Sequence, residues 1–132
     1  MAKATGSDEQ DSVKWLTAEE LDAWLSVIRL MIWLPWSIDQ QLQRDSDLAM
    51  VEYQVLAMLS ESPERTMRLS SLAEVTNAVL TEDGFQTLVA AAPGHVAHVR
   101  SLVIDVLSPE HLRRLGRDAQ RITSRIDTSA IN

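Results

Sequence analysis

The sequence predicts one small, mainly α-helical domain, and three observations carry that prediction. Its 132 residues, 45% hydrophobic and 23% charged, have the size and composition of a single globular domain. Four glycines and four prolines are too few for an all-β protein built from many tight turns. Apolar residues also recur every three or four positions along most of the chain, which is the period of an amphipathic helix.

The first long helix is predicted to begin at Thr17. Thr17 and Glu20 have the spacing of a capping box, in which each side chain accepts a hydrogen bond from the other residue's backbone N–H. Apolar residues follow at helical spacing from Leu21 to Trp36 and spread beyond one stripe after Leu30. This helix should therefore be buried on more than one side.

Two features qualify this helix. Pro35 has no backbone N–H and its ring clashes with the preceding turn, so a kink or a break is expected there. The most apolar stretch, Val27 to Ile38, contains Arg29 and is shorter than the roughly 20 residues that a membrane helix needs. We therefore expect this stretch to be buried in protein and expect no membrane partner.

The middle of the chain is predicted to hold two short helices and one strand. Asp45-Ser46-Asp47 offers caps for a helix that runs to Ser62-Pro63. The stretch from Arg65 to Arg68 can pair as a small edge strand. Ser71 and Glu74 repeat the capping-box spacing, which predicts a short helix between Leu69 and Asn77.

The last third is predicted to be helical again. A helix begins at Thr81, is interrupted at Pro93-Gly94, and continues in period to Ser108-Pro109. There Ser108 is placed to cap a final helix and Pro109 to occupy its first position.

Composition excludes several classes of function. The absence of cysteine rules out disulfides, thiolate catalysis and cysteine-ligated metal. The net charge of −7 gives no general attraction to nucleic acid. Residues 110–125 reverse the sign to +3, through Arg113, Arg114, Arg117, Arg121 and Arg125 against two acids. Arginines at this spacing are more often a solvated helix face than a nucleic-acid stripe. The acidic N-terminus is no secretory signal, so we expect a cytoplasmic protein.

No enzyme, metal site or cofactor is predicted. His95 and His98 are three residues apart, a spacing that can bind a metal, but no third ligand is evident nearby. His95 is more simply explained by packing or capping around the Pro93-Gly94 interruption. The sequence has no Ser-His-Asp set, no glycine-rich phosphate loop and no carboxylate pair with a motif of its own.

A series of short patterns in fixed order resembles the MarR family of bacterial regulators over residues 16–126. The patterns are Asp47-Leu48, Glu52-Tyr53-x-Val55-Leu56, Met67-Arg68-Leu69-Ser70-x-Leu72-Ala73, Leu80-Thr81-x-x-Gly84, Ala91-Ala92-Pro93-x-His95-x-x-x-Val99-Arg100, and Leu107-Ser108-Pro109-Glu110-x-x-x-Arg114-Leu115. The resemblance implies a winged helix-turn-helix domain and a dimer whose first and last helices intertwine. It divides the single domain into an N-terminus 1–14, dimerisation helices 15–45 and 81–126, and a winged helix-turn-helix segment 46–80.

The resemblance also implies roles for particular residues. The expected dimer interface comprises Leu21, Trp24, Leu25, Ile28, Leu102, Val106, Leu112 and Leu115. Many family members release DNA when a small aromatic compound or an oxidant acts on them, and the absence of cysteine favours either ligand sensing or no sensing at all here. Trp33 and Trp36 are the candidates for the wall of such a pocket, although packing in a core or a dimer is the commoner role for such residues.

The sequence departs from the family at its DNA-reading part. Asn77 runs directly into Ala78, where the resemblance implies a recognition helix and a wing. The helix that reads bases is thus absent, and residues 46–80 carry two arginines against five carboxylates, a net charge of −3. Arg68, Ser70 and Ser71 remain as candidates for contact with the DNA backbone, which would position the protein without specifying sequence.

Two explanations of this gap stay open. Either the protein has lost the segment, or the natural chain contains residues that this 132-residue sequence lacks; an intact mass near 14.8 kDa would exclude the second. The leading hypothesis is a homodimeric regulator that binds duplex DNA when its recognition helices are present. The alternative is a DNA-binding-deficient dimer that sequesters intact relatives or an aromatic compound.

Overall fold

The computed structural model describes residues 13–70 and 75–126. Its chain divides between Ser37 and Ile38 into two compact units, each described by itself. The first unit contains most of helix α2 (Ala18–Ser46). The predicted capping box is confirmed: the Thr17 N–H donates to Glu20 Oε1 at 2.9 Å, and the Glu20 N–H donates to Thr17 Oγ1 at 3.1 Å.

Helix α2 bears on two expectations, a kink or a break at Pro35 and burial of its apolar stretch. The helix runs through Pro35 and does not break there, since a proline removes one backbone hydrogen bond from a helix of 29 residues. The expected burial of the apolar stretch in protein is not provided by the single chain. Met31, Ile32, Trp33 and Trp36 each expose more than half of their surface. Burial depends on a second surface that covers these side chains, and the sequence pattern alone does not supply it.

Two helical stretches, Ala18–Ser46 and Glu82–Ile104, are long and apolar enough to cross a membrane by length and composition alone. This is weak evidence for a membrane protein, because core helices of other proteins pass the same test. Arg29 lies within the apolar part of the first stretch.

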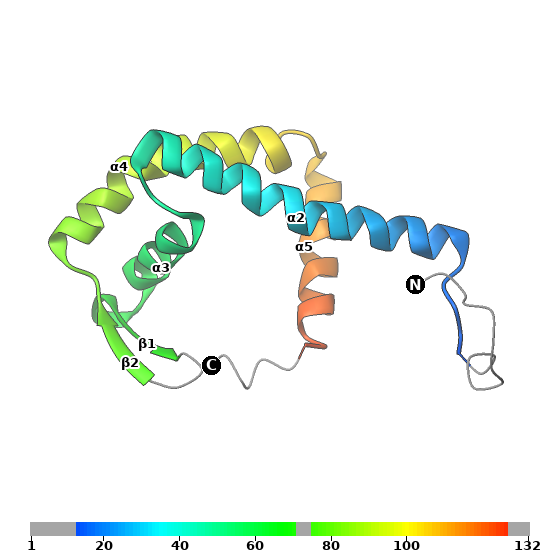
Figure 1. Cartoon of the computed structure of the whole chain (residues 1–132), viewed down its shortest axis with the longest axis horizontal. Helices are drawn as coiled ribbons and strands as arrows, with labels where there is room; N and C mark the ends of the chain where they lie inside the picture. Colours follow the sequence, from blue (N-terminus) through cyan, green and yellow to red (C-terminus); the bar gives the residue numbers. More distant parts are fainter. Residues whose placement is uncertain (1–12, 71–74, 127–132) are drawn as a thin grey trace. The chain divides into compact units, whose positions relative to one another are not determined.

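The second unit begins with the last turns of α2 and contains all the remaining elements (Figure 1). In chain order these are α3 (Met50–Glu61), the 3-10 turn η1 (Pro63–Arg65), β1 (Thr66–Ser70), β2 (Val75–Val79), α4 (Glu82–Val99), the π-helical turn η2 (Arg100–Ile104) and α5 (Pro109–Thr123). The end of α2 lies beside α4, and α3 packs against α4 (Figure 1). Leu42 is fully buried at the centre of this unit. The other buried apolar residues are Ile38, Leu48, Tyr53, Leu59, Leu80, Leu88 and Ala91.

The start of α3 is capped differently from the prediction. The N-cap is Ala49, and the N-cap backbone N–H donates to Glu52 Oε1 at 3.0 Å, whereas a residue of the Asp45-Ser46-Asp47 break was expected there. Asp39 in α2 supplies a second acceptor, since its Oδ1 takes the Met50 N–H at 2.8 Å. The Asp39 carboxylate in α2 thus satisfies a backbone N–H at the start of α3, as an N-cap side chain would. The residues next to α3 in sequence give no sign of this contact, because Asp39 is 11 positions away.

Strands β1 and β2 form an antiparallel pair in which Thr66 lies opposite Val79 and Ser70 opposite Val75. The edge strand predicted near Arg65–Arg68 is confirmed. The helix predicted between Leu69 and Asn77 is wrong, because strand β2 begins at Val75; the Ser71 and Glu74 capping pair lies outside the described residues. Two reasons explain the strand. Its backbone N–H and C=O groups bond to those of β1, and Val75, Thr76 and Val79 are β-branched residues, which favour strands. A two-stranded hairpin is therefore present where the sequence predicted the loss of the wing.

Helix α4 begins as predicted, with Thr81 Oγ1 accepting the Gly84 N–H at 3.0 Å. It continues through Pro93-Gly94, where an interruption was expected. A β-carbon on Gly94 would lie 3.3 Å from Gln41 Nε2, so this glycine lets α4 approach α2 closely. Helix α5 begins as predicted, with Pro109 in the first turn and Ser108 Oγ accepting the His111 N–H at 3.2 Å.

Candidate functional site

The residues predicted for a dimer interface lie on incompletely covered surfaces in both units. In the first unit, Trp24 and Leu25 are exposed and Leu21 and Ile28 are half-buried. In the second unit, Leu102, Val106 and Leu115 are exposed and Leu112 is half-buried. None of the eight is buried in the single chain. Each unit thus presents apolar surface that its own residues do not cover.

Trp33 and Trp36, the candidates for an aromatic pocket, are each 64% exposed. Both lie in the first unit, on the part of α2 that is apolar on more than one side. Two indole rings held on one helix supply broad aromatic surface with a polar N–H on each. The pocket itself stays a prediction.

The candidates for DNA-backbone contact lie at the hairpin. Arg68 and Ser70 belong to β1, opposite Asn77 and Val75, and Ser71 lies outside the described residues. Only residues 71–74 separate the two strands. At 3.6 residues per turn, four residues are too few for the two helices of a helix-turn-helix. The connection between these strands therefore has no room for a base-reading helix.

The hairpin is anchored to α4 through Arg65. Its carbonyl accepts the Leu80 N–H at 2.9 Å, and its guanidinium carbon lies 4.0 Å from the centre of the Phe85 ring. An exposed ion pair to Glu82, with Nη1 and Oε2 3.8 Å apart, adds little. Glu64 and Arg65 both have positive φ, at 55° and 52°, a left-handed conformation that turns the chain from α3 into β1 at a cost of about 1–2 kcal/mol per residue.

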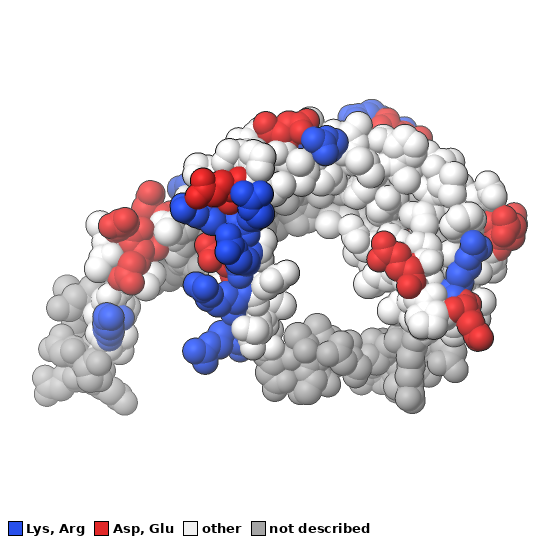
Figure 2. Space-filling model, turned by 180° about the vertical axis from the view of Figure 1, so that it is seen from behind, with Lys and Arg blue, Asp and Glu red and all other residues white. Residues whose placement is uncertain are grey.

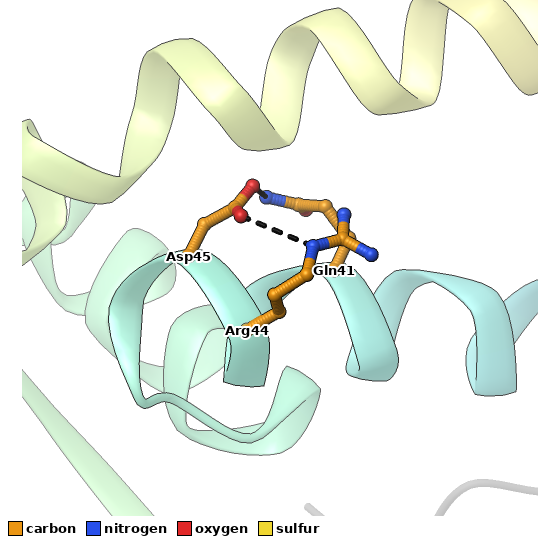
Figure 3. A network of polar contacts seen from close by, with 3 residues as sticks. All are labelled: Gln41, Arg44 and Asp45. Atoms are coloured by element: carbon orange, nitrogen blue, oxygen red, sulfur yellow. Dashed lines mark hydrogen bonds and ion pairs between the residues drawn. The ribbon is translucent and has the colours of Figure 1, made fainter.

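A polar cluster lies on α2 beside α4 in the second unit, with one member buried and two, Arg44 and Asp45, exposed. Gln41 is buried, and its side-chain amide donates to Asp45 Oδ2 at 3.0 Å (Figure 3). Arg44 Nε lies 3.3 Å from the other carboxylate oxygen of Asp45 (Figure 3). The hydrogen bond from Gln41, followed by the contact with Arg44, lowers the pKa of Asp45. The cluster therefore keeps an ionised carboxylate beside α4.

His95 and Tyr53 are in contact with each other in the core of the second unit. Their ring centroids are 4.1 Å apart, and both side chains are buried. Burial lowers the pKa of His95, the nearby His98 lowers it further, and burial raises the pKa of Tyr53. His95 Nδ1 and Gln41 Oε1 are buried without a hydrogen-bond partner among the described residues. Packing of His95 agrees with the simpler interpretation of its sequence position, although the helix interruption expected beside it does not occur.

Sequence reasoning missed Gln41 and the Tyr53–His95 contact. A signal for Gln41 was available, since it falls between Ile38 and Leu42 on the apolar side of a long helix. Nothing local signals the ring contact, because Tyr53 and His95 are 42 positions apart and meet only through tertiary packing. Within residues 13–70 and 75–126, no three His, Asp or Glu side chains are grouped closely enough to hold a metal.

No protein-family model and no curated protein matches the chain. Solved structures do match. Sco3205, a MarR family transcriptional regulator from Streptomyces coelicolor solved in complex with DNA, is 30% identical with a TM-score of 0.79, over 89% of this chain and 94% of that one. AbsC, a MarR family transcriptional regulator from the same organism, is 29% identical with a TM-score of 0.75, over 86% of this chain and 97% of that one.

A MarR family transcriptional regulator from Silicibacter pomeroyi has the same fold, with 16% identity and a TM-score of 0.62 over 92% of this chain and 100% of that one. The likeness to Sco3205 extends to sequence as well as fold over nearly the whole of that protein. The mainly helical architecture, with its hairpin between α3 and α4, agrees with the order of motifs in the sequence. The chain belongs to the MarR family of transcriptional regulators.

Proposed function

We propose that the chain regulates transcription as a cytoplasmic homodimer that contacts duplex DNA. The observation that carries the proposal is the structural and sequence likeness to Sco3205, which was solved with DNA. The dimer is supported by apolar side chains on the first unit and on η2 and α5 that stay exposed in the single chain. Large apolar side chains left uncovered in numbers on a single chain are typical of an interaction surface.

The proposed DNA contact is made to the phosphate backbone. Arg68 and Ser70 in β1, with Ser71 next to them in sequence, are the candidates at the hairpin. The four residues between β1 and β2 are too few for a helix that reads base edges. We therefore expect binding that depends on salt and depends little on DNA sequence.

A second candidate function is a dimer that does not bind DNA and acts by sequestering intact relatives or an aromatic compound. The observation in its favour is the same short connection, together with the net charge of −3 on residues 46–80. That charge opposes the approach of phosphate to the hairpin.

An aromatic effector belongs to the proposal as well, with Trp33 and Trp36 as the wall of its site. Ring stacking against an indole would change its fluorescence. Tryptophan emission that stays constant during titration with salicylate would remove the effector from the proposal.

The deciding experiment begins with the intact mass of the protein purified from its natural source. A mass near 14.8 kDa means that the 132-residue chain is the regulator itself; a larger mass means that the natural chain contains residues that this sequence lacks, and peptide mapping then shows whether they lie between β1 and β2. The purified protein is then titrated into duplex DNA carrying its own promoter and into mixed-sequence duplex, over about 50–200 mM salt. Salt-dependent binding supports DNA contact, and sequence preference is expected only with the larger mass. No binding at any salt concentration favours the second candidate.

A further inference from the structure

We propose that α5 carries a docking surface for the phosphate backbone of duplex DNA, formed by Arg113, Arg117 and Arg121 and called here the arginine face. This surface is separate from the hairpin, and it adds a contact that the proposed function does not contain. The inference rests on the proposed dimer in one respect: a second copy covers the apolar side of α5 and leaves the arginine face outward.

The arginine face follows from the helical repeat. Its members are spaced four residues apart within α5, so they lie on one side and recur about every 6 Å along the helix axis. The residues of the opposite side are Leu112, Leu115, Ala119 and Ile122. In Figure 2 the basic side chains along α5, all of them arginines, form a blue column. The helix is thus sharply divided between an apolar side and a cationic side.

The charges of the arginine face are largely available to a ligand. Arg113 and Arg117 form no ion pair with any described residue. Arg121 Nη1 lies 3.9 Å from Asp118 Oδ1, and this long, solvent-exposed ion pair holds the arginine weakly. Glu110, at the N-terminal end of the same face, forms an ion pair with Arg114, whose Nη2 lies 2.9 Å from Glu110 Oε1. Residues 110–125 therefore keep a net charge of +3 in a chain whose total charge is −7.

A depression in the surface lies beside two of these arginines. It is open to solvent and is lined by Arg113, Gly116, Arg117 and Gln120. A β-carbon added to Gly116 would meet no atom within 4 Å, so packing within the chain does not require this glycine. A glycine in the middle of a helix costs about 1 kcal/mol relative to alanine. A phosphate oxygen can approach the helix backbone here, between two guanidinium groups.

Three considerations favour DNA over other anions. A guanidinium can donate two parallel hydrogen bonds to a phosphate, and a row of them matches a polymer that carries charge at a regular interval. A single small anion would engage only one or two of the arginines. An anionic membrane would have to bury the apolar side of α5, which the proposed dimer already uses.

The test compares two double variants with equal change in net charge. Arg113→Gln/Arg117→Gln removes the two arginines without ion pairs. Arg44→Gln/Arg100→Gln removes two arginines that lie outside α5 and are paired with Asp45 and Asp105. Binding to a mixed-sequence duplex is measured by fluorescence anisotropy over about 50–200 mM salt, and sedimentation velocity reports the assembly state of each protein.

We expect the Arg113/Arg117 variant to lose at least about tenfold in affinity at the lowest salt. Its slope of log K against log salt should become shallower by roughly 1.8, at about 0.9 for each lost phosphate contact. The control variant should keep the wild-type slope. Equal losses in both variants, or no salt-dependent binding by the wild type, would overturn the inference. Binding to phosphatidylglycerol vesicles with none to DNA would overturn it in favour of a membrane surface.

Failure of this inference can be told apart from failure of the proposed function. A monomer whose DNA binding depends on Arg113 and Arg117 would refute the dimer and leave the arginine face standing. A dimer that binds DNA equally well with and without these two arginines would refute the arginine face and leave the proposed function standing.

Discussion

At the scale of one residue, burial of His95 makes the stability of the fold depend on pH. Its imidazole contacts the Tyr53 ring at 4.1 Å, and Nδ1 has no hydrogen-bond partner among the described residues. His98 on the same helix lowers the pKa of His95, and Asp45 on α2 interacts with His98. A proton added to His95 would therefore place a charge on a buried ring, which burial disfavours.

We predict that the free energy of unfolding falls as pH is lowered below about 6.5, the pKa of an ordinary histidine. Burial lowers the pKa of His95 in the folded protein, so the unfolded chain takes up the proton first. The stabilisation is complete above the unfolded pKa and is lost as pH falls toward the folded one. Urea denaturation at pH 7.5 and 5.5 measures the difference. His95→Phe, which keeps a ring against Tyr53, should reduce the loss, whereas His111→Gln on exposed α5 should not. Equal pH dependence in all three proteins would contradict the prediction.

At the scale of elements, the helix boundaries were the most predictable feature. Thr17, Thr81 and Ser108 cap the helices that the sequence assigned to them, since a cap satisfies backbone N–H groups only three residues away. An interruption was predicted at Pro93, and α4 runs through it without one; Pro35, where a kink or a break was expected, likewise lies inside a continuous helix. A proline removes one hydrogen bond, and this loss is local, whereas the packing that holds a long helix together is distributed along it.

Gly116 gives a prediction for α5. We expect Gly116→Ala to raise the free energy of unfolding by about 0.5–1 kcal/mol, because alanine is the better helix former and its β-carbon meets nothing within 4 Å. Thermal or urea denaturation measures the gain. Ala119→Gly, on the apolar side of the same helix, should lose a similar amount. A loss of stability in Gly116→Ala would show that another surface covers this position in the assembled protein.

At the scale of the whole molecule, exposed apolar surface on both units favours association. We expect Leu25→Asp to raise the dimer dissociation constant at least about 100-fold, equivalent to roughly 2.7 kcal/mol, because a carboxylate would be buried in the interface. Sedimentation velocity across a concentration series measures the change. Ser26→Asp places the same charge on the side of α2 that carries Asp22 and Arg29 and should leave the dimer intact. A dimer in which both variants associate like the wild type would not use the Leu25 side of α2.

The sequence by itself determined the helical class, the main caps, β1 and the family. The helical class depends on local periodicity, the caps depend on contacts three residues apart, and the family depends on the order of motifs. All three can be found in the sequence without knowledge of the fold. Tertiary structure decided that residues 75–79 pair with β1 as a strand, that Asp39 caps α3, and that Gln41 and His95 enter the core. The physical reason is the same in each case. Backbone groups and side chains far apart in sequence can satisfy one another only after folding, and their local propensities do not record which partner they will meet.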